Sequence, residues 1–227
     1  MTAKSPPLTG RHYRTMAEAA LAELHDAVVT GALPPGAPLR LEELAASLDM
    51  SISPIREAIR ELESLGLAEH SPHRGARVTD LSVDALRDTY EARLALESLA
   101  VRRAAEVFDD QQAEIAQSRL DAYTEAWGDG ESRDLRERHA AFHFALYEAS
   151  GSVWLPRLIL PVWYSSERYR FFSLGERGST ADLRGEHQLI LDACIAHDPD
   201  QAERLLYSHL AKTANLVASK MGAVTLF

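Results

Sequence analysis

The chain has 227 residues, 46% of them hydrophobic, and a formal net charge of −10 at pH 7. Its length suits one large domain or two small ones, and no apolar run approaches the roughly 18 residues that a membrane-spanning helix needs. Residues 1–10 lack the apolar core of a signal peptide and Cys194, the single cysteine, cannot form an internal disulfide, so we expect a cytoplasmic protein without a membrane partner. The acidic balance excludes a uniformly basic nucleic-acid binder, so DNA binding would need a local basic face.

The N-terminal region begins with a turn-rich segment and continues into helices. Residues 1–10 contain two prolines and a glycine and are expected to form a flexible arm. Residues 15–30 carry apolar side chains at helical spacing and predict a first helix, which the Gly-Ala-Leu-Pro-Pro-Gly turn at residues 31–36 ends. A second, shorter helix is predicted at residues 41–48.

A third helix follows after a tight turn. Ser51 or Ser53 can cap it, Pro54 lies in its first turn where a missing N–H costs nothing, and Gly66 suits its C-terminal end. Residues 67–79 predict two short strands around a turn. Two helices joined by a tight turn and followed by a hairpin are the layout of a winged helix-turn-helix, whose second helix enters the DNA major groove.

The candidate DNA contacts lie near the start of that second helix and in the hairpin turn. Serine hydroxyls and arginines suit phosphate oxygens, and arginine also suits guanine edges. The alternative is an ordinary helical hairpin with a solvated charged face, because short helix-turn-helix patterns arise by chance. The candidate set is Arg40, Ser51, Ser53, Pro54, Arg56, Arg60, His73, Arg74 and Gly75.

A linked pattern over residues 31–79 extends this motif. Its pieces are the turn at 31–36, Leu44-Ala45, Ser51-Ile-Ser-Pro-Ile-Arg-Glu-Ala-Ile-Arg60, Leu62-Glu63, Gly66-Leu67 and Arg74-Gly75. The pattern resembles the winged helix-turn-helix of the GntR family of bacterial transcription regulators. The resemblance implies a homodimer on a near-palindromic double-stranded operator. Glu42 and Ile52 stand where many members carry DNA-contacting arginines, so we expect the operator to differ from the family's usual one.

Beyond Asp80 the chain becomes helix after helix. The interruptions between Ser82 and Ser219 leave about six helices and no convincing strand. The predicted fold class is therefore mainly α, with an N-terminal winged helix-turn-helix followed by an all-helical bundle of about six helices. The expected organisation is a flexible arm at 1–10, a DNA-binding domain at 11–79, a helical domain at 80–221 and a tail at 222–227. The resemblance to this family of regulators implies that the helical domain binds a ligand and forms the dimer.

Four of the nine histidines share a pattern in this helical part. His139 and His143 are four residues apart and therefore lie on one helical face, beside an apolar stripe. His187 and His209 lie on inward stripes of two further helices. If the four converge, their neutral imidazoles could bind zinc, nickel, copper or iron. A hydrogen-bonded core position is the commoner place for a buried histidine, because His-x-x-x-His is a weak motif.

A second set of residues strengthens the metal hypothesis. Its pieces are Tyr90-Glu-Ala-Arg-Leu-Ala-Leu-Glu97, Phe142-His143, Glu148-Ala-Ser-Gly151, Glu186-His187, Ile190-Leu191 and His209-Leu210. Residues 81–219 thereby resemble the FCD ligand-binding domain of the FadR branch of GntR regulators, in its short VanR-like form. Many such domains bind a divalent metal through three histidines, which map onto His143, His187 and His209, and one aspartate, whose position maps onto His139. The all-imidazole set that this implies favours zinc, with nickel or copper as alternatives, over manganese.

Arg93 is the candidate effector contact. In similar domains an arginine at this place reaches into the pocket near the metal, where its fork would suit a small carboxylate. The alternative is a structural ion pair with Glu97, four residues further on. The sequence thus predicts a DNA-binding transcription regulator, with repression as the common mode of the family, controlled by a small organic acid. Two alternatives stay open: a metalloenzyme with a four-histidine site, and a regulator whose metal is purely structural.

Overall fold

A computed structural model describes residues 13–71, 75–127, 132–172 and 180–227. The chain divides into two compact units, Met1–Leu81 and Ser82–Phe227, and each is described by itself. The prediction of a mainly helical fold, with a small two-stranded wing after the first helices and six helices after the wing, is confirmed for the described residues. None of the helices in these ranges combines the length and hydropathy that a bilayer-spanning segment requires.

The first unit is a three-helix arrangement with a hairpin. In chain order its elements are α1 (Met16–Val29), α2 (Leu41–Leu48), α3 (Ile52–Ser64), β1 (Ala68–Ser71) and β2 (Gly75–Val78). The two strands are antiparallel, and Pro38 adds a bridge to Arg77, so the segment before α2 lies along the hairpin. Helix α1 packs against α3, which buries the apolar stripe of the second helix of the motif.

Local geometry explains the tight turn and the end of α3. Asp49, at the end of α2, has a φ of 54°, a left-handed conformation that aspartate tolerates better than most residues and that reverses the chain within a few residues. Gly66 has a φ of 70°, and the amide of Leu67 donates to the carbonyl of Leu62 at 2.9 Å, which is the Schellman pattern. Ser51 occupies the N-cap position of α3 but makes no side-chain capping bond, so the predicted serine cap is present in position only.

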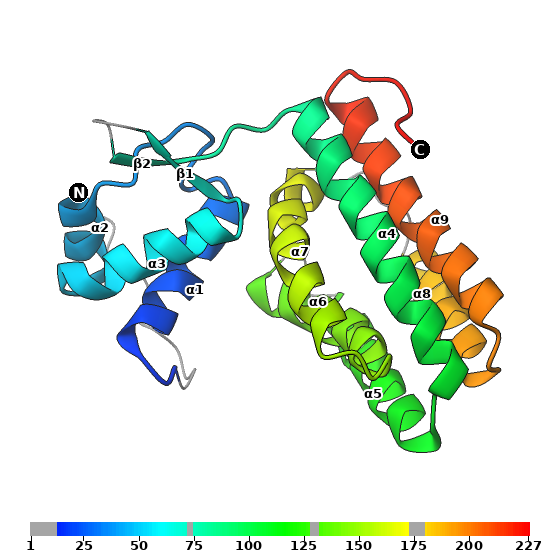
Figure 1. The fold of residues 1–227 in the computed structure, drawn as a ribbon. Coiled ribbons are helices and arrows are strands. Elements are labelled where there is room, and N and C mark those ends of the chain that lie inside the picture. Colours follow the sequence, from blue (N-terminus) through cyan, green and yellow to red (C-terminus); the bar gives the residue numbers. More distant parts are fainter. Residues whose placement is uncertain (1–12, 72–74, 128–131, 173–179) are drawn as a thin grey trace. The chain divides into compact units, whose positions relative to one another are not determined.

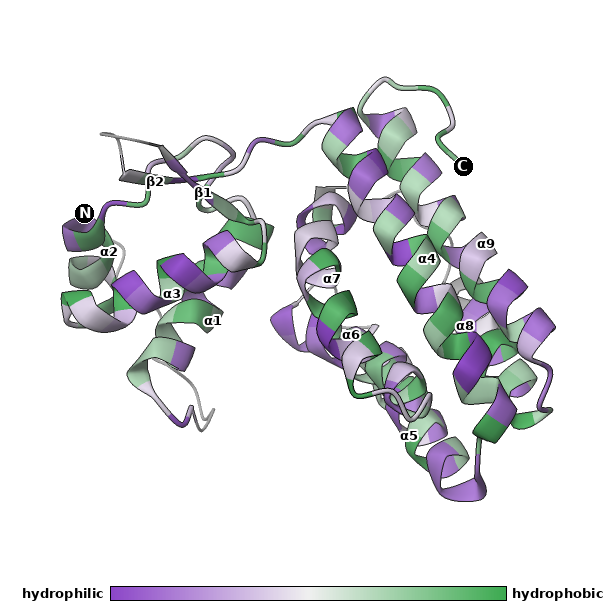
Figure 2. Cartoon of the chain, viewed as in Figure 1, coloured by the Kyte–Doolittle hydropathy of each residue, from purple (hydrophilic) through white to green (hydrophobic). Residues whose placement is uncertain are grey.

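The second unit is a bundle of six helices among the described residues. They are α4 (Val83–Val107), α5 (Asp110–Ala126), α6 (Arg133–Glu148), α7 (Trp154–Phe172), α8 (Thr180–Ile195) and α9 (Pro199–Lys220). Helix α4 runs beside α9 and also packs against α7, while α5 packs against α6 and α8 (Figure 1). Hydrophilic and hydrophobic residues alternate around these helices, as expected where each helix has one buried face (Figure 2). Cys194 is buried in this core.

Capping side chains set where several of these helices begin. The side chains of Ser82, Asp109, Ser132 and Asp198 each accept a hydrogen bond from a backbone amide in the first turn of α4, α5, α6 and α9. Each such cap contributes about 1 kcal/mol by satisfying an amide that the helix itself cannot pair. Two of the capped helices, α6 and α9, carry three of the four candidate metal ligands, so local sequence fixes the register from which these side chains project.

Candidate functional site

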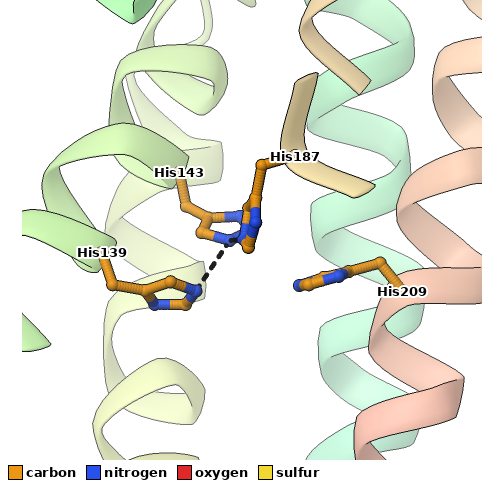
Figure 3. A group of neighbouring side chains, drawn as sticks. All are labelled: His139, His143, His187 and His209. Atoms are coloured by element: carbon orange, nitrogen blue, oxygen red, sulfur yellow. Dashed lines mark hydrogen bonds between the residues drawn. The ribbon is translucent and has the colours of Figure 1, made fainter. Parts of the chain in front are cut away.

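The four predicted histidines meet in the interior of the helical bundle. His139 and His143 project from α6, His187 from α8 and His209 from α9, toward one point (Figure 3). One ring nitrogen of each lies within 4.8 Å of the corresponding nitrogen of every other. All four side chains are buried, with His209 the most exposed at 8%. The convergence that spacing left open therefore occurs.

The nitrogens lie close to the spacing that a bound metal would need. The Nε2 atom of His143 is 3.1 Å from the Nε2 atom of His139 and 3.1 Å from the Nε2 atom of His187. A tetrahedral zinc site with bonds near 2.0–2.1 Å would separate neighbouring ligand nitrogens by about 3.3–3.4 Å. Small side-chain adjustments would suffice, so the residues present fit a divalent metal.

The electrostatics of the site keep two of the four histidines, His139 and His143, in the neutral form. Burial lowers the pKa of His139 well below its ordinary value, and the positive charge of Arg170 adds to this effect. Burial also lowers the pKa of His143, with a further contribution from His187 and His209. A neutral imidazole keeps a lone pair on one nitrogen, which is the form that coordinates a metal.

Helix α8 supplies an acidic partner for one of these candidate ligands. The Nδ1 atom of His209 lies 2.9 Å from Glu186 Oε2, and Lys212 pairs with the other oxygen of the same carboxylate. The hydrogen bond from His209 is the main cause that lowers the pKa of Glu186 to about 2. An ionised carboxylate requires Nδ1 of His209 to be the donor, which leaves Nε2 for the cluster. Such outer carboxylates orient metal-binding histidines in proteins.

Arg93 makes the ion pair that was the alternative to effector contact. Its Nε and Nη2 atoms bond the two oxygens of Glu97 at 2.6 and 3.1 Å, and Nη1 bonds Ser166 Oγ at 3.0 Å. The guanidinium also lies over the rings of Tyr90 and Trp163, 5.0 and 4.8 Å from their centroids. Three of its five N–H donors are thus engaged inside the protein.

Tyr147 and Trp163 are neighbours of the cluster that sequence reasoning did not single out as site residues. The Tyr147 hydroxyl is 3.1 Å from Nδ1 of His143 and donates a hydrogen bond to Glu97. Burial, together with the negative charge of Glu97, raises the pKa of Tyr147 well above its ordinary value. The indole of Trp163 stacks on the ring of His139. Tyr147 could have been found because it lies one helical turn after His143, whereas nothing local marks Trp163.

The candidate DNA-binding residues are largely on the surface of the first unit. Ser51, Ser53, Arg56 and Arg60 are exposed along α3, whose opposite face is buried. Arg40 pairs with Glu43 at 2.7 Å, so part of its charge is already neutralised. The remaining candidates are divided by the hairpin: Pro54 is half-buried, Gly75 begins β2 with a φ of 78°, and His73 and Arg74 lie outside the described residues.

A pocket of about 400 Å³ lies between α3 and the hairpin of this unit. Its charged lining is mixed, since Arg40, Arg56 and Arg60 share it with Glu42 and Glu63. The arginine set can meet phosphate oxygens or guanine edges. The two glutamates would repel phosphate, so the basic character of this pocket comes from its arginines.

Comparisons with known proteins agree with both units. The family model "Bacterial regulatory proteins, gntR family" matches residues 16–78, and the model "FCD domain" matches residues 88–212. The chain is 34% identical over 200 residues to the "Probable D-xylose utilization operon transcriptional repressor" of Paenarthrobacter nicotinovorans, covering 87% of this chain and 86% of that protein. It is 28% identical over 207 residues to the "HTH-type transcriptional repressor GlaR" of Escherichia coli K12, covering 87% and 94%.

Solved structures resemble the fold along nearly the whole chain. The E. coli McbR/YncC structure matches with a TM-score of 0.77 at 25% identity, covering 92% of this chain and 100% of that one. A putative transcriptional regulator GntR from Rhodococcus sp. RHA1 matches with a TM-score of 0.71 at 23% identity, covering 89% and 97%, which supports the fold alone.

Proposed function

This chain belongs to the GntR family of bacterial regulatory proteins, with the C-terminal FCD domain of the FadR branch, and from that premise we propose how it is controlled. It is a DNA-binding transcription regulator of a family that is not enzymatic, so the metalloenzyme alternative is set aside. We propose that it acts in the cytoplasm as a homodimeric repressor, released from its operator by a small organic acid that binds beside a metal in the helical unit.

The observation that carries this proposal is the buried group of four imidazoles inside the FCD bundle. His139, His143, His187 and His209 would hold a divalent metal, and an all-nitrogen set favours zinc, with nickel or copper next. When bound, the metal would supply a Lewis-acidic positive centre for an anion. The family's aspartate is replaced by His139, so no ligand in this group brings a negative charge.

The surroundings leave that positive charge uncompensated. The two outer carboxylates on the described residues near the cluster are each matched by a cation, Glu186 by Lys212 and Glu97 by Arg93. A divalent metal held by neutral imidazoles would therefore keep its net charge and attract an anion. This supports a small carboxylate as the effector. Arg93 is the second proposed contact of this effector. It would donate hydrogen bonds to the carboxylate from the N–H groups that are not already bonded to Glu97 and Ser166.

The DNA half of the proposal rests on the exposed face of α3 and the hairpin. Arg56 and Arg60 lie on the exposed face of α3 and line one pocket with Gly75, and Ser51 and Ser53 add hydroxyls at the start of the helix. Together with Arg40, Pro54, His73 and Arg74 they form the proposed DNA-binding set. Two copies of the unit would read two half-sites related by two-fold symmetry.

The test begins with DNA selected by the protein itself. Fragments of the host genome retained by the purified full chain are sequenced, and the expected result is a two-fold symmetric motif upstream of a few genes. Zinc and a panel of small organic acids are then added to the complex, with release of the fragment as the readout. Retention of random fragments or of none contradicts operator recognition, and release by none of the acids contradicts effector control.

A purely structural metal is the second candidate, favoured by the burial of all four histidines. In that case removing the metal would lower the thermal stability of the helical unit and leave the affinity for an organic acid nearly unchanged. Our proposal predicts instead that removing the metal lowers the affinity for an organic acid more than it lowers thermal stability, because the metal itself is the main anion contact. Calorimetry with metal-loaded and chelator-treated protein separates the two.

A further inference from the structure

A line of hydrogen bonds leads from His143 into the centre of helix α4. The Nδ1 atom of His143 is 3.1 Å from the Tyr147 hydroxyl, which lies 2.5 Å from Glu97 Oε2. Glu97 in turn accepts two hydrogen bonds from Arg93, at 2.6 and 3.1 Å. All four side chains are buried, with exposed fractions of at most 2% for those on α4. We call this line, His143–Tyr147–Glu97–Arg93, the relay.

We propose that Tyr147 and Glu97 are positioning residues for the metal ligand His143. By accepting a hydrogen bond from the Nδ1–H group of His143, the Tyr147 hydroxyl holds His143 in the tautomer that turns an unprotonated Nε2 toward the other histidines. Glu97 and Arg93 hold Tyr147 in the orientation that makes this possible. The inference deepens the proposed metal site and rests on it.

The direction of each hydrogen bond follows from the donors available. Arg93 can only donate, and an ionised carboxylate such as Glu97 can only accept. A neutral phenol has a single O–H, and at 2.5 Å from Glu97 Oε2 that proton belongs to the Glu97 bond. The phenol oxygen is then left to accept, and the atom facing it is Nδ1 of His143. His143 must therefore carry its proton on Nδ1.

A second histidine of the cluster is also held at Nδ1 by a carboxylate, but without an intervening hydroxyl. His209 donates from Nδ1 directly to Glu186, whereas His143 reaches its carboxylate through a hydroxyl. Two ligands from different helices are thus oriented by buried or half-buried carboxylates that each carry their own cation. This repetition is what a metal site requires, since its ligands need one defined nitrogen each.

The relay also connects three helices of the bundle. His143 and Tyr147 belong to α6, Glu97 and Arg93 to α4, and Arg93 continues to Ser166 on α7, whose hydroxyl donates to the Trp163 carbonyl at 2.7 Å. Helix α4 begins at Val83, directly after the first unit ends at Leu81. Metal binding would therefore act, through these hydrogen bonds, on α4, the helix that follows the DNA-binding unit in the chain.

The first measurement uses the metal-free full chain without any substitution. Long-range proton–nitrogen correlation spectra of histidine-labelled protein report which ring nitrogen of each histidine carries its proton. The expected result is protonation of His143 on Nδ1 and of His209 on Nδ1. Protonation of His143 on Nε2 would overturn the proposal whatever the metal affinity is.

The second measurement compares two tyrosine variants for zinc affinity. Tyr147→Phe removes the hydroxyl from the relay, and Tyr90→Phe is a matched control, because the Tyr90 hydroxyl is also buried but has no hydrogen-bond partner among the described residues. We expect Tyr147→Phe to weaken zinc binding by about 10- to 100-fold, the usual cost of losing an outer partner, and Tyr90→Phe to leave it unchanged.

The outcomes separate the relay from the metal site itself. Equal zinc affinity of Tyr147→Phe and Tyr90→Phe would refute the role of Tyr147. Failure of the unsubstituted chain to bind zinc, nickel or copper would refute the proposed metal site, and with it the role of Tyr147 and Glu97 as positioning residues for a metal ligand. If Tyr147→Phe does not fold, the spectra of the unsubstituted chain alone carry the decision.

Discussion

Replacement of Arg93 by alanine distinguishes its two candidate roles. The substitution would leave Glu97, which is fully buried, without its counter-charge, and it would also remove the cation from the rings of Tyr90 and Trp163. Breaking one side of a buried ion pair costs about 3–5 kcal/mol, because the remaining charge stays in a poorly solvating interior. For a domain of this size that corresponds to a fall in melting temperature of roughly 10 °C.

Tryptophan fluorescence during urea unfolding of the full chain provides the assay. The three tryptophans, Trp127, Trp154 and Trp163, all lie in the helical unit, so the signal reports its unfolding and not that of the DNA-binding unit. A double variant, Arg93→Met with Glu97→Leu, is the matched control. It removes both charges and should lose less free energy of unfolding than the sum of the two single variants, because no charge is left unpaired.

Two results would refute this reasoning. A loss below about 1 kcal/mol for Arg93→Ala, the range of an exposed pair, would mean that the ion pair is not buried in solution. Additive losses in the double variant would mean that the two side chains do not interact. A small loss of stability combined with a large loss of response to organic acids would instead assign Arg93 chiefly to effector contact.

Three further predictions concern the DNA face, the metal and the outer carboxylate. Arg56→Ala should lower operator affinity by about 10- to 100-fold in a gel-shift assay, the cost of one lost arginine contact, with the helical content unchanged by circular dichroism; equal affinity would remove Arg56 from the DNA contacts. His143→Ala with His187→Ala should abolish bound zinc in elemental analysis after dialysis, and full occupancy would show that the metal lies elsewhere. Glu186→Gln should lower the melting temperature at pH 7, because the depressed pKa of Glu186 means that its charge stabilises the folded state above the ordinary pKa of 4.5. The difference from the unsubstituted chain should shrink as the pH falls from 4.5 toward 2, and a difference that persists there would contradict the assignment.

The helix-turn-helix could be predicted in detail because each of its signals is local. The apolar stripe of α3, the turn around Asp49 and the left-handed Gly66 depend on neighbours within a few residues. The exposure of Arg56 and Arg60 follows from the same periodicity, since a helix that buries one face presents the other. The serine cap of α3 was the local detail that did not form, because Ser51 makes no side-chain bond to the first turn.

The site in the helical unit was only half predictable. Spacing placed His139 and His143 on one face of a helix, but it could not say whether His187 and His209 would meet them across two other helices. Spacing likewise could not choose between the two roles of Arg93, whose partner Glu97 lies one turn away while Ser166 comes from α7. The choice between an ion pair and an effector contact depends on whether Arg93 and Glu97 are buried, and helical periodicity alone did not decide that.

The sequence by itself therefore determined the helices, the winged motif and the faces from which the histidines project. The family resemblance implied that the four imidazoles share one site, and the tertiary structure showed that they converge. Only the tertiary structure decided that Tyr147 links His143 to Glu97 and that Arg93 is held inside the core. The physical reason is range. Hydrogen bonds and caps within a helix are set by residues three or four apart, whereas a buried site is assembled by packing between helices that are distant in the chain.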